Sequence, residues 1–350
     1  MKKAKSYLVI AAIFTMLNCD KADCGYDVIA SPQIASDTVI PEGCDLVASI
    51  NLSSGIDTDG NLLIPGDGMI DPFWRVLNNP PLLFCDSPLM NSINGSSYVV
   101  NFGSFDNVNW VNQPTASTLA PMNLGTTNDF GCNNPINGLG IQVPYVFERA
   151  FCVLKDTQVN FHFTYKGDDQ IYFELVNNFT NAVLSTSIRY VYNDIPFIWS
   201  ENNMSLSSGS YSLRGYLINT SSVVLGFSIA GSVETSNGDE AISNNVKGCC
   251  ENNTISILNI LDSGCDGVFT NTDTFGSGWT FNLRDSSNAI IRTATANADG
   301  NIFFSGLDNG TYTVQAIAQD GYTTSAPAGG VITVTVSENM VRIVEFYNCQ

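Results

Sequence analysis

The stretch ADGNIFFSGLDNGTYTV, residues 298–314, decides the fold of the C-terminal part of the chain. Asp299-Gly300 is a tight-turn dipeptide, because glycine accepts a positive φ at no steric cost. An apolar, β-forming run at 302–304 follows this turn. A second turn at 306–310 comes next, and Tyr312 begins another strand. Short strands punctuated by turns at this spacing predict a small β-sandwich.

The composition of the chain favours β structure and an acidic surface. Its 350 residues carry 14 Lys and Arg against 33 Asp and Glu, a net charge of −19. Nucleic acid and anionic membranes bind through basic patches, so we expect neither as a partner. Charged residues make up only 13% of the chain, and the Ala, Leu, Glu and Lys runs that build long helices are missing. The length suffices for two or three domains, and we expect them to be all-β.

The N-terminus has the features of an export signal. Basic residues at 2–5 precede an apolar run at 7–17, which is too short to span a bilayer. The run ends at Leu17-Asn18-Cys19 and resembles a Bacteroidetes lipoprotein signal. This resemblance implies removal of residues 1–18 and a lipid on Cys19, with a plain cleaved signal as the alternative. We expect residues 19–43 to be a tether and the protein to lie on the outer membrane, at the cell surface or outside the cell. The lipid anchor would be its only contact with a membrane.

The cysteines of an exported chain predict disulfides rather than a metal or redox site. No Cys-x-x-Cys pair occurs and the chain has a single histidine, so a structural zinc site is not expected. The adjacent Cys249 and Cys250 cannot easily pair with each other, so we expect them to attach their segment at two places. The disulfide candidates are Cys24, Cys44, Cys85, Cys132, Cys152, Cys249, Cys250, Cys265 and Cys349.

Residues 44–235 form one block of strand-length apolar runs separated by turn clusters. Short strands at this spacing predict a jelly-roll-like β-sandwich. The segment YVFERAFCVLKDTQVNFHFTYKGDDQIYFELVNN at 145–178 resembles the jelly-roll modules of the galactose-binding-like group, through Phe147-Glu148-Arg149 and Gly167-Asp168-Asp169. The polar stretch 236–252 is expected to be a linker into a second domain at 253–350.

That second domain resembles a known family. The stretch at 298–314 is followed by GYTTSAP at 321–327, VITVTV at 331–336 and VEFYN at 344–348. In this order the motifs resemble the B-type repeat domain of Gram-positive SD-repeat and collagen adhesins. The resemblance implies a transthyretin-like (prealbumin-like), Ig-like β-sandwich that serves as a stalk or spacer.

The same resemblance bears on how the second domain is closed. Many domains of the family join a Lys in the first strand to an Asn in the last strand, with a Glu promoting the reaction. Here the first strand, 254–260, has no Lys, and Gln315 stands in the place of the Glu, although Asn348 is present. We therefore expect a disulfide instead. The family's crosslink brings the chain ends together, which implies that Cys349 pairs with Cys249 or Cys250.

Two acidic loops are candidate Ca²⁺ sites. The first offers oxygen ligands at alternate positions from Asp57, Asp59 and Asn61. Gly68 stands where a bidentate Glu would complete the loop, so a plain hairpin turn is the alternative. The second is the loop where the resembling family binds calcium, here interrupted by Cys265. It contains Asp262, Asp266, Asn271 and Asp273.

Aromatic side chains are the candidates for ligand binding, because a flat ring can stack on the apolar face of a sugar. For each of them a place in the hydrophobic core is the alternative, and Trp279 is expected in the core. The candidate platform residues are Trp74, Trp110, Tyr145 and Trp199.

Catalytic chemistry has little support in the sequence. The strand period places His162 opposite Phe161 and Phe163, and no nucleophile motif accompanies it. Glycoside hydrolysis would need two converging carboxylates, for which solvated turns are the alternative. The carboxylates considered are Glu148, Asp168, Asp169, Glu174 and Glu201.

We therefore predict an exported, non-enzymatic surface protein that binds a glycan or another surface protein. Ca²⁺ is the only cofactor considered. A structural subunit of an extracellular or envelope assembly is the alternative, and a glycoside-active enzyme ranks third. The ligand and the oligomeric state stay open.

Overall fold

The computed structural model describes residues 44–64, 69–78, 96–100, 113–121, 142–191, 195–220, 225–244, 249–250, 253–270, 272–338 and 340–350. The expected export signal and tether, with Cys19 and Cys24, lie outside these ranges, as do Cys85, Trp110, Cys132 and Asn271. Residues Val39–Gln350 form one compact unit. No helix in the described ranges is both long and apolar enough to cross a membrane.

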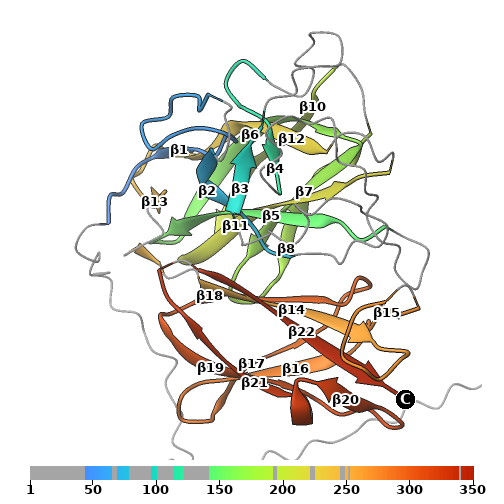
Figure 1. The fold of residues 1–350 in the computed structure, drawn as a ribbon. Coiled ribbons are helices and arrows are strands. Elements are labelled where there is room, and N and C mark those ends of the chain that lie inside the picture. Colours follow the sequence, from blue (N-terminus) through green and yellow to red (C-terminus); the bar gives the residue numbers. More distant parts are fainter. Residues whose placement is uncertain are drawn as a thin grey trace, which may run out of the picture. The chain divides into compact units, whose positions relative to one another are not determined.

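The first module is one 13-stranded sheet in which all pairs are antiparallel (Figure 1). Its path runs β10-β6-β12-β4-β3-β2-β5-β11-β7-β8, with β1 on β12, β13 on β5 and β9 on β7. The strands are β1 Ser49–Asn51, β2 Ile70–Val76, β3 Ser96–Val99, β4 Leu119–Ala120, β5 Tyr145–Val153, β6 Thr157–Asp168, β7 Gln170–Asn177, β8 Val183–Thr186, β9 Tyr190–Val191, β10 Phe197–Leu206, β11 Gly209–Ile218, β12 Gly226–Thr235 and β13 Ile242–Ser243.

The two halves of this sheet pack face to face around an aromatic core, which makes the module a sandwich. Phe147 of β5 meets Phe227 of β12 with ring centroids 4.8 Å apart, and Tyr165 of β6 meets Phe173 of β7 at 5.3 Å. Buried and more exposed residues alternate along β6, as the period of two in a half-buried strand requires. Aromatic rings bury large areas, so this cluster supplies most of the module's apolar burial.

Strand β5 is buried along its whole length, because both of its faces are covered. Phe147 and Phe151 point into the aromatic core. Val146, one residue before Phe147, belongs to the opposite face, where it packs in a cluster with Phe303 of the second module. A strand covered on both sides has no solvent-facing polar positions, which explains the nearly continuous apolar run in its sequence.

The second module is a two-sheet sandwich. One sheet has the order β15-β14-β22-β20 with β18 on β14, and the other has the order β17-β16-β19-β21. The first and last strands, β14 and β22, pair in parallel. The strands are β14 Asn253–Leu261, β15 Thr274–Phe275, β16 Thr280–Arg284, β17 Ile290–Thr295, β18 Asn301–Leu307, β19 Gly310–Ala316, β20 Thr323–Ala326, β21 Val331–Val336 and β22 Val341–Cys349, with a short 3-10 turn η3 Ala328–Gly330 before β21.

The stretch at 298–314 contains the expected turns, and they link the two sheets of this sandwich. Gly300 has φ +71° and donates its N–H to the Asn297 carbonyl. Strand β17 before this turn belongs to one sheet and β18 after it to the other. The next turn, at Asp308-Asn309, returns the chain to the sheet that contains β19. The interior between the sheets holds Trp279, as expected, together with Phe281, Phe304 and Phe346. The all-β fold and the two-sheet sandwich expected for the second domain are confirmed.

Two disulfides attach the segment between the modules to the first module. Cys249 bonds to Cys44 and Cys250 to Cys152. The expectation that these adjacent cysteines attach their segment at two places is confirmed. Strand β13, inside the expected linker, also joins the first sheet by pairing with β5. The connection is therefore part of the first module over much of its length.

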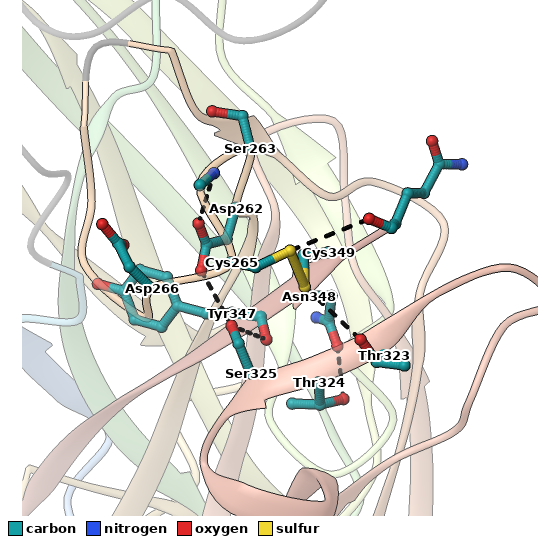
Figure 2. The surroundings of a disulfide bond; sticks show 12 residues. Asp262, Ser263, Cys265, Asp266, Thr323, Thr324, Ser325, Tyr347, Asn348 and Cys349 are labelled. Atoms are coloured by element: carbon teal, nitrogen blue, oxygen red, sulfur yellow. Dashed lines mark hydrogen bonds between the residues drawn. A yellow bond between two sulfur atoms is a disulfide. The ribbon is translucent and has the colours of Figure 1, made fainter.

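The expected pairing of Cys349 with Cys249 or Cys250 is wrong, because Cys349 bonds to Cys265 (Figure 2). The parallel pairing of β14 and β22 gives the physical reason. It aligns Leu261 at the end of β14 with Asn348 at the end of β22. The loop that follows β14 therefore lies beside Cys349, whereas Cys249 and Cys250 precede the opposite end of β14. A disulfide needs Cα atoms roughly 4.4–6.8 Å apart, and here they are 5.4 Å apart.

Candidate functional site

Three of the four aromatic platform candidates lie in the hydrophobic core, which corrects the expectation that they form a ligand surface. Trp74, Tyr145 and Trp199 are all buried among the rings of the first module. Trp74 packs edge-on against Phe227, and Trp199 donates its indole N–H to the Ser185 hydroxyl. Their faces are already occupied by neighbouring side chains and cannot stack on a ligand. The fourth candidate, Trp110, lies outside the described residues.

The first acidic loop is a hairpin turn stabilised by its own backbone. Ile56 and Leu62 form a bridge across it. The Asp57 carboxylate accepts the N–H groups of Asp59 and Asn61 at 2.9 and 2.8 Å, and the hydrogen bond from Asn61 leads the contacts that lower the pKa of Asp57. Such bonds are typical of turns begun by aspartate. Calcium binding here stays a prediction.

The second acidic loop is likewise hydrogen-bonded internally (Figure 2). Asp262 accepts the N–H groups of Gly264 and Gly267 and the hydroxyl of Ser325. Burial alone would raise the pKa of Asp262, but these hydrogen bonds hold it below its usual value. Asp273 accepts four such bonds from Ser263 and Thr270. Within the described ranges, no three acidic, His or Cys side chains gather as metal ligands, and Ca²⁺ stays a prediction here too.

His162 is exposed between the buried Phe161 and Phe163, as the strand period predicts. Its Nδ1 atom lies 2.8 Å from the Ser200 hydroxyl on the neighbouring strand β10. The two residues line a small hollow of about 250 Å³, together with Glu234 of β12. They lie in the middle of paired strands. The histidine therefore fits an ordinary strand-face position.

Glu148 serves as a structural anchor, and its carboxylate is fully buried. Arg75 approaches it at 2.5 Å and Arg214 at 3.4 Å. Burial alone would raise the pKa of Glu148, but the two guanidinium charges hold it below its usual value. A carboxylate engaged in this way is not available for acid or base chemistry.

The arginines that hold Glu148 also contact the second module. Arg75 donates from Nη2 to the Thr254 hydroxyl of β14, and Arg214 donates from Nη2 to the Ser305 hydroxyl of β18, each at 3.1 Å. Thr254 and Ser305 are hydrogen-bonded to each other. The buried charge network thus joins the two modules. None of these contacts had a signal in the sequence beyond the charged pair Glu148-Arg149 inside an apolar strand.

Asp168 and Asp169 lie at the end of β6. Asp169 accepts hydrogen bonds from the backbone N–H and the hydroxyl of Thr220. Burial, together with the neighbouring Asp169 carboxyl, raises the pKa of Asp168 to about 8. The hydrogen bonds of Asp169 tie the residues after β6 to Thr220.

The two remaining carboxylates considered for glycoside hydrolysis are also hydrogen-bonded to neighbouring side chains. Glu174 accepts a hydrogen bond from the Tyr216 hydroxyl, and Glu201 accepts one from the Ser185 hydroxyl. Each is thus engaged with a neighbour of its own, on different strands.

A cleft of about 560 Å³ is bordered by residues of β7, β8 and β11 on one side and of β17 and β18 on the other. We call it the β8–β17 cleft. Its volume lies within the range of about 300–1,000 Å³ that small-molecule sites occupy. The residues that matter most for its chemistry are Glu174, Phe179, Tyr216, Arg292, Asn301 and Phe303.

One wall of the β8–β17 cleft carries an exposed ring. Phe179, in the turn before β8, is 68% exposed. The Arg292 guanidinium lies 4.6 Å from its ring centroid. Arg292 also donates to the carbonyl oxygens of Asn178, Ser305 and Gly306, so its hydrogen-bonding capacity is largely used. The cation therefore holds the ring in place from one side.

Asn301, one of the residues that line the cleft, has a side-chain amide without a partner in the described residues. Asn301 is only 3% exposed, and neither its Oδ1 nor its Nδ2 has a hydrogen-bond partner within the described residues. Nearby, the Tyr216 hydroxyl donates to Glu174 Oε2 at 2.7 Å. Buried side-chain amides are usually hydrogen-bonded, so an orphaned one that lines a cleft is informative. No sequence signal distinguishes Asn301 from the other asparagines.

Together the fold and the cleft define an all-β protein of two joined sandwiches, the second of which is prealbumin-like. Residues 269–350 match the family model described as "SpaA: Prealbumin-like fold domain".

Curated relatives match about a fifth of the chain. One is the serine-aspartate repeat-containing protein F of Staphylococcus epidermidis, which is 39% identical over 74 residues, or 21% of this chain and 4% of the relative. Another is the serine-aspartate repeat-containing protein D of Staphylococcus aureus, which is 33% identical over 69 residues, or 20% of this chain and 5% of the relative. The chain thus spans about a twentieth of the length of these relatives.

Solved pilin structures are similar only at a low level. The minor pilin GBS52 of Streptococcus agalactiae is 14% identical, with 53% of this chain and 84% of that chain covered and a TM-score of 0.24. The major pilin subunit BcpA of Bacillus cereus is 13% identical, with 62% of this chain and 66% of that chain covered and a TM-score of 0.21.

Proposed function

We propose that this protein is a non-enzymatic adhesion or binding protein displayed at the cell surface, with the first module as the binding part. The observation that supports this most is the prealbumin-like sandwich at residues 269–350, in a chain whose curated relatives include serine-aspartate repeat proteins. The second module then acts as a spacer, and Cys19 carries the lipid that holds the chain at the membrane. Glycans and surface proteins are both candidate ligands.

The joint between the modules supports a spacer role. Glu148, Arg75 and Arg214 are buried and bonded across to Thr254 and Ser305. The disulfides of Cys249 and Cys250 fix the connecting segment as well. A spacer holds a binding module in a fixed orientation only if the joint between them is stiff, because interfaces between domains otherwise permit relative motion.

The test is a cell-binding assay with the full chain, purified with its disulfides intact and labelled with a fluorophore. We expect saturable binding to cells or to extracellular matrix, competed by unlabelled protein. A heat-denatured, reduced sample serves as the control. Absence of saturable binding to every surface tried would count against an adhesion role.

A structural subunit of an extracellular assembly is the second candidate, favoured by exposed isoleucines around β9 and the start of β10. Ile188, Ile195 and Ile198 are each more than half exposed, and exposed apolar groups gathered in one region mark interaction surfaces. We expect concentration-dependent association by sedimentation velocity if this candidate holds, and Ile198→Asp would reduce it. A monomer at all concentrations would exclude self-assembly through this surface.

A further inference from the structure

The β8–β17 cleft combines three features that suit a carbohydrate. An exposed ring, Phe179, stands at its wall and is held by Arg292. A carboxylate, Glu174, has one oxygen bonded to Tyr216, and its other oxygen has no partner within the described residues. The amide of Asn301 offers both a donor and an acceptor. Ligand sites are typically apolar concavities with a few placed polar groups, which is the pattern found here.

The unpartnered amide of Asn301 supports a ligand site independently of the volume and the exposed ring of the cleft. A buried polar group without a partner is costly, so a chain that keeps one usually uses it for a ligand or an ordered water. The amide presents a carbonyl oxygen and an N–H₂ group side by side. Neighbouring sugar hydroxyls both donate and accept, so they can satisfy both groups at once.

The charges in the cleft argue against an anionic ligand. Arg292 is already bonded to three carbonyl oxygens and stacked on Phe179. Arg214 is paired with the buried Glu148. The Glu174 carboxylate would repel an anion that entered between them. A neutral ligand with hydroxyl groups avoids this conflict.

We propose that the β8–β17 cleft binds a neutral saccharide, stacked on Phe179 and hydrogen-bonded to Asn301 and Glu174. This inference rests on the proposed surface-binding function and names a site and a ligand class for it. The Asn301 side chain fixes the orientation of the sugar, and the Phe179 ring covers its apolar face.

The experiment is an array of neutral oligosaccharides, gluco-, galacto-, manno- and xylo-configured, followed by titration calorimetry on the sugar that binds best. The full chain is compared with Phe179→Ala, Asn301→Leu and Thr295→Trp, the last of which fills the cleft from β17. Val268→Ala removes an equally exposed apolar side chain outside the cleft and is the matched control. We expect binding to fall about tenfold or more in the three cleft variants and to be unchanged in the control.

Thermal unfolding and the cell-binding assay, measured on the same variants, decide how a loss of sugar binding is interpreted. Thermal unfolding of each variant shows whether a loss of binding reflects misfolding, and Phe179→Ala, in an exposed turn, should unfold as the wild type does. The cell-binding assay is run on the same variants. Cell binding without affinity for any arrayed sugar would overturn the saccharide inference and leave the surface function standing. Sugar binding that survives in Phe179→Ala and Asn301→Leu would place the site elsewhere.

Discussion

Glu148 and Arg214 are direct cross-strand partners on β5 and β11, and Arg214 Nε lies 3.4 Å from Glu148 Oε1. Arg75 meets the same carboxylate from β2. All three side chains are largely buried. Two cations and one anion are therefore held together with little access to water, where the first module meets the second.

We expect Glu148→Ala to lower the free energy of unfolding by about 3–5 kcal/mol, because it leaves two buried guanidinium groups without their anion. Urea unfolding monitored by tryptophan fluorescence measures this. The control is Asp239→Ala, which breaks the exposed pair between Lys155 and Asp239 and should cost no more than about 1 kcal/mol. Equal effects of the two substitutions would contradict a structural role of the buried network.

The pairing of Cys265 with Cys349 can be mapped by mass spectrometry of a digest made without reductant. The bridge closes a separation of 84 residues, so the chain-entropy model gives about 4–5 kcal/mol, and measured values often run lower. We expect Cys349→Ala to lower the melting temperature by several degrees. A peptide that links Cys349 to Cys249 or Cys250 would refute this connectivity.

Asp168 makes the stability depend on pH. Its pKa is about 8 in the folded chain, against 3.8 in the absence of burial and the Asp169 carboxyl. Between these values the folded state holds a proton that the unfolded chain has released. The free energy of unfolding therefore falls as the pH rises from about 4 to about 8.

The side chain introduced by Asp168→Asn stays neutral, so the free energy of unfolding of this variant should not fall with rising pH in this way. Relative to the wild type, it should gain stability with rising pH by at most about 1.4 kcal/mol per pH unit. Chemical unfolding at pH 5 and pH 8 gives the comparison. Parallel pH profiles of the two proteins would show that Asp168 titrates normally.

Asn301→Leu should raise the free energy of unfolding by about 1–3 kcal/mol, since it replaces an unpaired buried amide with an apolar group of similar size. Asn259→Leu is the matched control, because Asn259 is also buried but bonds to the Gly276 carbonyl and to Asn348. That substitution should destabilise the protein. Destabilisation by both changes would mean that Asn301 has a partner in solution.

Cys19→Ala tests the expected lipid anchor. The wild type and Cys19→Ala are each expressed in a Gram-negative host, and the cells are separated into membrane and soluble fractions. We expect the wild type in the membrane fraction and the variant in the soluble one, because several acyl chains are needed for stable anchoring. A variant that still fractionates with membranes would exclude anchoring through Cys19.

The periodicity and turn chemistry of the sequence predicted the all-β class and the second sandwich, because these signals are local. The turn at Asp299-Gly300 and the exposed side of β6 at His162 are examples that the structure reproduces. The adjacent cysteines in the polar stretch also indicated that this segment is attached at two places, as the bonds of Cys249 and Cys250 show.

What the sequence did not reveal depends on contacts between distant segments. Trp74 and Tyr145 looked like ligand platforms, because a single sequence does not tell a core ring from an exposed one. The partner of Cys349 depends on the parallel pairing of β14 with β22, which no local pattern encodes. Asn301 is notable only because its side-chain amide has no hydrogen-bond partner in the part of the chain that the structure describes.

The parallel pairing of β14 with β22 has a mechanical consequence. Tension applied between Asn253 and Cys349 pulls these neighbouring strands lengthwise past each other, so their backbone hydrogen bonds are loaded together and must break nearly at once. Strands pulled apart from one end would break them singly, under much smaller force. The Cys265–Cys349 bridge ties the end of β22 to the loop after β14, so the strands can slide only until this short loop is taut, and the covalent link then carries the load. The second module is thus built to stay folded under a pull along the chain.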